Sequence, residues 1–102
     1  MSPKLPIQIL VPLCLLAIGT GVQAAGVSPG AMLGNSCSAC HGTDGKSPGA
    51  IPSINGKTAS FITSSLKEFR SGARASTVMG RHAMGYSDEE IQLIADHFAG
   101  LK

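Results

Sequence analysis

Apolar residues recur at helical spacing in two stretches of the chain. The first runs from Thr58 to Ser71, and Gly72 follows where a glycine commonly ends a helix. The second runs from Ser87 to Gly100. The apolar faces comprise Phe61, Ile62, Leu66 and Phe69 in the first stretch, and Ile91, Ile94, Ala95 and Phe98 in the second. The pattern predicts two helices that bury these faces in one core.

The start of the last helix is marked by several independent signals. Ser87 is followed three residues later by Glu90, which is the pattern of a capping box. Tyr86 and Ile91 are spaced as a hydrophobic staple, and Asp88 complements the helix dipole. We therefore expect this helix to begin at Ser87 and to pack on the first helix of the domain.

A further helix is predicted at the amino end of the domain. Ser28 can cap it, and Pro29 suits its first position. Two segments without a helical pattern, 42–57 and 72–86, separate the three helices, and the first contains four glycines and two prolines. Loops this long are uncommon in a compact domain unless something fills the space that they enclose.

The amino-terminal segment reads as an export signal. Lys4 precedes an apolar run from Ile7 to Ile18, and Val22-Gln23-Ala24 forms a small-x-small cleavage pattern. The run is shorter than the roughly twenty apolar residues of a membrane-spanning helix, which disfavours an uncleaved anchor. We expect residues 1–24 to be a signal peptide, residues 25–102 to form one domain, and the product to be periplasmic.

The charge and size of the chain limit the classes of function that it can have. The whole chain has a formal net charge of only +2, which disfavours nucleic-acid binding because that depends on clustered basic residues. A small glycine-rich domain usually needs a disulfide, a metal or a cofactor to hold it together.

The cysteines indicate which of these it is. Cys37-Ser38-Ala39-Cys40-His41 matches the C-x-x-C-H attachment signature of c-type haem. Residues three apart share one helical face, so both thiols can add to the vinyl groups on one porphyrin edge. His41 can then ligate the iron. We expect one covalently attached haem c.

Three other uses of these cysteines fit the sequence less well. A disulfide between Cys37 and Cys40 would close a very short loop and leave His41 without a role. A thioredoxin-like dithiol would need a surrounding βαβ unit, which the pattern does not supply. A zinc-binding module would need a second pair of ligands at close spacing, which is missing.

The second axial ligand is expected in the segment 72–86, which contains three candidates, Met79, His82 and Met84. Gly80 beside Met79 removes side-chain bulk where the backbone would approach the ring. Spacing alone leaves the three candidates open.

With these features the domain resembles a class I cytochrome c. The attachment motif, the Pro52-Ser53-Ile54 segment and a methionine ahead of the last helix match the family pattern. The resemblance implies an all-α fold of three to four short helices and long loops around one haem. It also implies that the Pro52 carbonyl accepts a hydrogen bond from the ligand histidine.

A narrower resemblance is carried by Phe69-Arg70-Ser71-Gly72, by the run from Ala75 to Arg81, and by Gly85-Tyr86-Ser87. These segments are similar to the cytochrome subunits of flavocytochrome c sulfide dehydrogenases. This resemblance implies that Met79 is the sixth ligand and that a flavin-containing sulfide dehydrogenase subunit donates the electrons.

A histidine–methionine pair would fill both axial sites and leave electron transfer as the function of the chain, without catalysis of its own. The alternatives are a free shuttle to a terminal oxidase or another redox protein and, in a different class, a haem sensor or a zinc-binding module.

Overall fold

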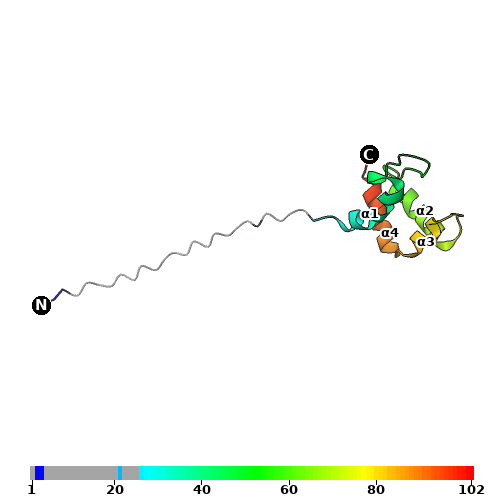
Figure 1. The fold of residues 1–102 in the computed structure, drawn as a ribbon. Helices are drawn as coiled ribbons and strands as arrows, with labels where there is room; N and C mark the ends of the chain where they lie inside the picture. The colour runs from blue at the N-terminus through cyan, green and yellow to red at the C-terminus, as the bar shows by residue number, and fades with distance from the viewer. Residues whose placement is uncertain (1, 4–20, 22–25) are drawn as a thin grey trace.

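The computed structural model describes residues 2–3, 21 and 26–102 of the chain. The predicted cleavage site at Ala24 and nearly all of the predicted signal peptide therefore lie outside the described residues. In order along the chain, the elements of the described part are α1 (Pro29–His41), the 3₁₀ turn η1 (Thr43–Gly45), α2 (Ala59–Ser71), α3 (Met79–Met84) and α4 (Asp88–Ala99). This part is helical without strands, which confirms the predicted all-α class (Figure 1).

The three long helices begin where the sequence predicts. The Ser28 hydroxyl accepts a hydrogen bond from the Ala31 amide at 3.2 Å, and Thr58 caps α2 in the same way through the Phe61 amide at 3.1 Å. Ser87 and Glu90 form both hydrogen bonds of the capping box at the start of α4. Side-chain oxygens thus satisfy amides that a helix leaves without intrahelical partners.

The two predicted loops are not fully irregular, and each contains a short helix. In the segment 42–57, η1 begins directly after Gly42 and ends at Gly45, and both of these glycines have positive φ. In the segment 72–86, α3 spans six residues and buries Ala83 completely. The prediction of an unbroken loop was wrong here because one and a half turns are too short to produce a recognisable apolar period.

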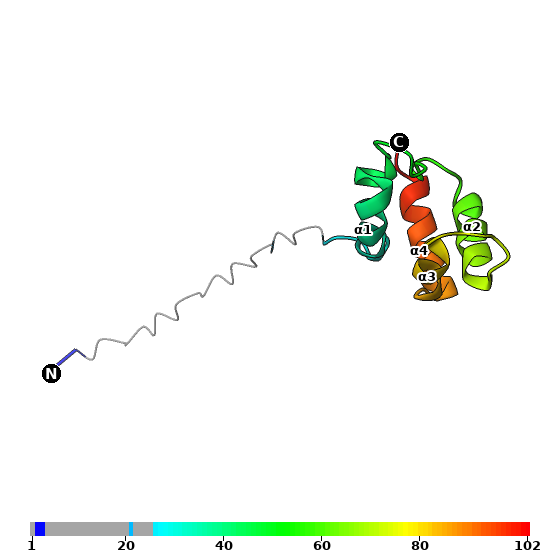
Figure 2. The same ribbon diagram turned by 45° about the vertical axis from the view of Figure 1, so that its right-hand side comes forward.

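The core lies where α4 meets the other helices. Its fully or nearly fully buried side chains are Ile62, Leu66, Ala83, Ile91, Ile94, Ala95 and Phe98. Helix α4 lies between α1 and α2 (Figure 2), and the short helix α3 packs on α2. Gly30 and Gly34 are the buried residues of α1, and their lack of side chains lets α1 approach the backbone of Leu93 and the ring of Phe98.

A polar network joins three helices beside this core. The Arg70 guanidinium on α2 donates to the Tyr86 carbonyl at 3.1 Å and forms an ion pair with Asp88 at the start of α4. The Tyr86 hydroxyl is 2.9 Å from the Ser36 hydroxyl on α1. The network holds the corner before α4 against both neighbouring helices. None of the helices in the described residues has the length and apolar character needed to cross a membrane.

Candidate cofactor site

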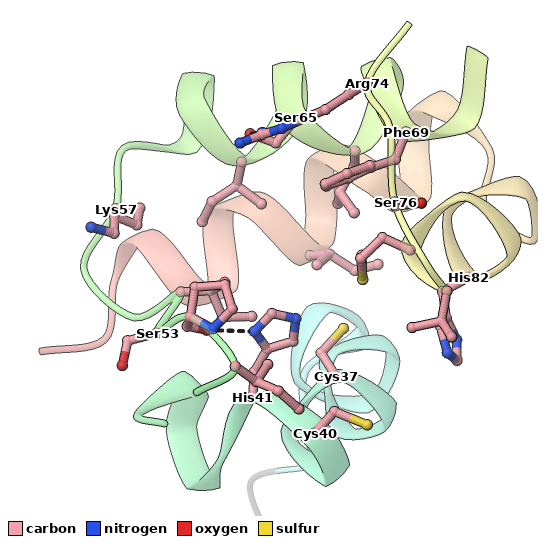
Figure 3. Close-up of a pocket in the computed structure, with 18 of the residues that line it drawn as sticks. Cys37, Cys40, His41, Ser53, Lys57, Ser65, Phe69, Arg74, Ser76 and His82 are labelled. Carbon is pink, nitrogen blue, oxygen red and sulfur yellow. Dashed lines mark hydrogen bonds between the residues drawn. The ribbon is translucent and has the colours of Figure 1, made fainter. Parts of the chain in front are cut away.

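A cavity of about 630 Å³ opens beside the core, within the size range of small-molecule and cofactor sites. Helix α1 borders it on one side and α2 on the other, as the labelled side chains show (Figure 3). Its apolar lining comprises Ile51, Ile54, Phe61, Ile62, Leu66, Phe69, Val78 and Ile94. Phe61 and Val78 are 51% and 53% exposed, so the polypeptide alone leaves these walls in contact with solvent.

The last two turns of α1 bring Cys37, Cys40 and His41 to this cavity (Figure 3). Cys37 is half-buried and Cys40 is exposed. Burial raises the pKa of the Cys37 thiol above its usual value, outweighing the hydrogen bond from Ser36 that lowers it. Redox-active dithiols need the opposite shift, because the thiolate is the reactive form. This environment disfavours a thioredoxin-like role for the pair.

His41 is oriented by a hydrogen bond to the backbone of the loop that borders the cavity. Its Nδ1 atom lies 2.6 Å from the carbonyl oxygen of Pro52, which also lines the cavity. A carbonyl oxygen can only accept, so Nδ1 carries the hydrogen. In the neutral ring Nε2 then keeps its lone pair for a metal ion, and the hydrogen bond strengthens its donor character.

The structure separates the three candidates for the second ligand. Met79 begins α3, is half-buried against the core and lines the cavity. His82, one turn later on the same helix, also lines the cavity but is exposed. Met84 is 70% exposed and does not line it. A Cβ atom on Gly80 would meet only Ser76 and the Phe69 carbonyl, at 3.4 and 3.5 Å, so the protein itself leaves room for a side chain there.

Several polar residues that line the same cavity were not predicted from the sequence. They are Arg74, Ser65 and Lys57, and none of them belongs to a motif named above. Lys57 lies before α2, Ser65 within it and Arg74 after it, and the position of α2 in the fold brings all three side chains to the cavity. Their placement therefore depends on tertiary structure rather than on any local motif.

These residues fit a covalently bound porphyrin. Two thiols stand three residues apart on one helix, a histidine presents Nε2, a thioether is available from another helix, and the walls are apolar. A structural zinc ion would need four close ligands. The described residues contain no cluster of three or more histidine, cysteine or carboxylate side chains suited to a metal ion.

Comparison with known proteins agrees with this description. The profile of the family described as cytochrome c matches residues 27–102. The cytochrome subunit of sulfide dehydrogenase from Chlorobaculum tepidum is 49% identical across 85% of this chain and 89% of its own length. Cytochrome c-554(548) of Halomonas halodenitrificans is 40% identical across 62% of the chain and 81% of its own length. Cytochrome c-553 of Nitratidesulfovibrio vulgaris is 33% identical across 93% of this chain and 97% of its own length.

Proposed function

The chain belongs to the cytochrome c family, and on this premise we propose which residues hold its haem, which partner supplies its electrons and where it acts. Its function is electron transfer with covalently attached haem c. When bound, the haem supplies reversible one-electron chemistry at its iron.

We assign covalent attachment to Cys37 and Cys40 and the first axial position to His41. The arrangement of all three at one edge of the cavity, with His41 fixed by the Pro52 carbonyl, is the observation that carries the assignment. Pro52 acts through its backbone, by holding the imidazole in the tautomer that can bind iron.

Met79 is the proposed second axial ligand. It alone among the three candidates combines a place in the cavity wall with partial burial. With His41 and Met79 both engaged, no axial position remains for a substrate or a gas, which distinguishes an electron carrier from a haem enzyme or sensor.

Attachment is tested on the purified protein. Acid denaturation followed by solvent extraction should leave the haem on the chain, and Cys37→Ser or Cys40→Ser should prevent complete maturation. Ser38→Ala, between the two cysteines, is the matched control and should mature normally. Haem that is fully extracted from the wild type, or a colourless protein with bound zinc, would refute the assignment.

The proposed electron donor is a flavin-containing sulfide dehydrogenase subunit. The support is the similarity to a relative whose name describes a cytochrome subunit of sulfide dehydrogenase. We place the contact around Val78 and Tyr86, which line the cavity, and Met84, which is exposed outside the lining. Close apolar packing that excludes water would shorten the electron path.

The proposed electron donor is tested by combining this chain with the flavoprotein and measuring haem reduction. The flavoprotein should co-purify with this chain and should accelerate haem reduction on addition of sulfide. Val78→Glu should slow that reduction without changing the spectrum, whereas Leu93→Glu, an exposed apolar position outside the cavity lining, should not. A rate of reduction that is the same with and without the flavoprotein would instead identify a free shuttle to another redox protein.

We further propose that residues 1–24 are a signal peptide and that the domain 25–102 acts in the periplasm. The family match begins at residue 27, just after the proposed cleavage point. Amino-terminal sequencing of the protein from the periplasmic fraction should begin at Ala25. A protein that retains Met1 in the membrane fraction would refute both statements.

A further inference from the structure

Arg74 is the arginine that lies in the cavity wall. Of the three arginines, Arg70 is engaged by Asp88, and Arg81 does not line the cavity. The Arg74 guanidinium donates to the Ser65 hydroxyl at 2.9 Å and lies 4.9 Å from the centre of the Phe69 ring. No carboxylate of the described residues pairs with it. A guanidinium has five N–H groups, so most of its donors remain available to a ligand.

The position of Arg74 relative to the cysteines points to the ligand. Figure 3 shows Cys37 and Cys40 at one end of the site and Arg74 with Ser65 at the other, on the far side of His41. In a porphyrin of the haem type the two propionates lie on the edge opposite the vinyl groups. When the cysteines hold the vinyl edge, the carboxylates therefore face the end of the cavity that α2 borders.

We propose that Arg74, assisted by Ser65, binds a haem propionate and thereby holds the segment 73–78 that positions Met79. This inference rests on the haem attachment proposed above. A shielded carboxylate needs a cation or several hydrogen bonds, and a guanidinium fork supplies both. Stacking on Phe69 keeps the fork in place before the carboxylate arrives.

The segment 73–78 connects this contact to the axial ligand. After Gly72 ends α2 in the left-handed conformation, the Arg74 amide donates to the Glu68 carbonyl at 3.2 Å. Further along the segment, the Ser76 hydroxyl accepts a hydrogen bond from the Gly80 amide of α3 at 2.9 Å. The Arg74 amide thus ties the segment 73–78 to α2, and the Ser76 hydroxyl ties it to α3, which begins at Met79. Loss of the Arg74 side-chain contacts would leave the bond from its backbone amide as the remaining hydrogen bond between Arg74 and α2.

The direct test is nuclear magnetic resonance of the reduced wild-type haem protein. We expect nuclear Overhauser effects between the propionate methylene protons and the side chains of Arg74 and Ser65. Effects to Lys57 in their place, or no effects to Arg74, would overturn the proposal. This measurement needs no variant and so does not depend on how a substitution folds.

Variants test the consequence for Met79. In Arg74→Gln the propionate would lose its positive partner, and its negative charge should favour ferric iron. The equilibrium constant for electron exchange with a mediator should therefore shift roughly tenfold toward the ferric protein, which is the size of effect expected for one charge at an intermediate effective dielectric constant. The absorption band of sulfur bound to ferric iron should also disappear at a lower temperature. Arg74→Lys should restore part of both properties, because it keeps the charge but loses the fork.

Arg81→Gln is the matched control. It removes the same charge from a side chain that is exposed, close in sequence and outside the cavity lining, so both properties should stay near those of the wild type. Equal behaviour of the two glutamine variants would overturn the inference while leaving the haem attachment intact. A wild-type protein without the sulfur band would instead contradict the proposed Met79 ligation.

Discussion

The close approach of α1 to α4 predicts different effects of alanine at two neighbouring glycines. A Cβ atom on Gly30 would lie 2.5 Å from the Leu93 carbonyl oxygen, a distance that only backbone movement can relieve. A Cβ atom on Gly34 would lie 3.0 Å from the Phe98 ring and 3.1 Å from the His97 ring. Those rings can yield by small rotations.

The two free-energy contributions have opposite signs. Replacing glycine by alanine in a helix gains at most about 1 kcal/mol, and less near the helix start where Gly30 lies. Overpacking typically costs about 1–3 kcal/mol, with the higher values where backbone must move. We therefore expect Gly30→Ala to destabilise the haem protein by about 1–2 kcal/mol and Gly34→Ala to be nearly neutral.

The assay is guanidinium unfolding of the haem-loaded protein, followed by helical circular dichroism. For a domain of this size the expected loss at Gly30 corresponds to a fall in Tm of roughly 5–15 °C. Asn35→Ala is the control, because it introduces alanine at an exposed position of α1 and so measures the gain in helix propensity without a steric clash. If Gly30→Ala unfolds at the same denaturant concentration as Asn35→Ala, then α1 and α4 do not pack at the distance described above.

The other predictions concern the ligand and the polar network. Met79→Ala should abolish the band of sulfur bound to ferric iron whereas Met84→Ala should not, and the reverse result would move the ligand to Met84. Tyr86→Phe should cost about 1 kcal/mol in unfolding experiments by removing the hydrogen bond to Ser36, and additivity with Ser36→Ala in a double-mutant cycle would contradict this contact. The hydrogen bond from Arg70, with the charge of Lys67, lowers the pKa of Asp88 below its ordinary value of 3.8. The resulting stability is therefore present above that pH and is lost as the pH falls through the lowered pKa. Asp88→Asn should reduce the acid sensitivity of the denaturation midpoint, and an unchanged pH profile would show that the ion pair contributes nothing.

The sequence was informative where local chemistry determines structure. Ser28 and Ser87 cap helices through contacts only three residues away, as predicted from their spacing, and Thr58, which was predicted only as a helix start, caps α2 in the same way. The buried stripe of α4 follows from helical periodicity in the same way. The attachment motif is similarly local, since one turn of helix brings its cysteines to one edge of the cavity.

The missed features depend on residues that are distant in sequence. No sequence pattern indicated a packing role for His97, which is half-buried with its ring against the Gly34 position of α1. Arg74 is distinguished from Arg70 and Arg81 only by its contacts with the cavity, which no one-dimensional pattern displays. The difference in exposure between Met79 and Met84 likewise arises from the docking of α3 on the core.

The exposed walls of the cavity have a consequence for how the native state persists. A ligand held without covalent bonds stabilises a protein by an amount that depends on the free ligand concentration, so dilution removes the stabilisation. Here the apolar walls that need covering include Phe61, Val78 and Ile51, the last 44% exposed in the polypeptide alone. Haem attached at Cys37 and Cys40, as proposed above, would cover these walls from within the same molecule, so that dissociation could not uncover them. The stability of this small domain would therefore not depend on the concentration of free haem once maturation is complete. Dilution of the protein would leave its apolar cavity walls covered.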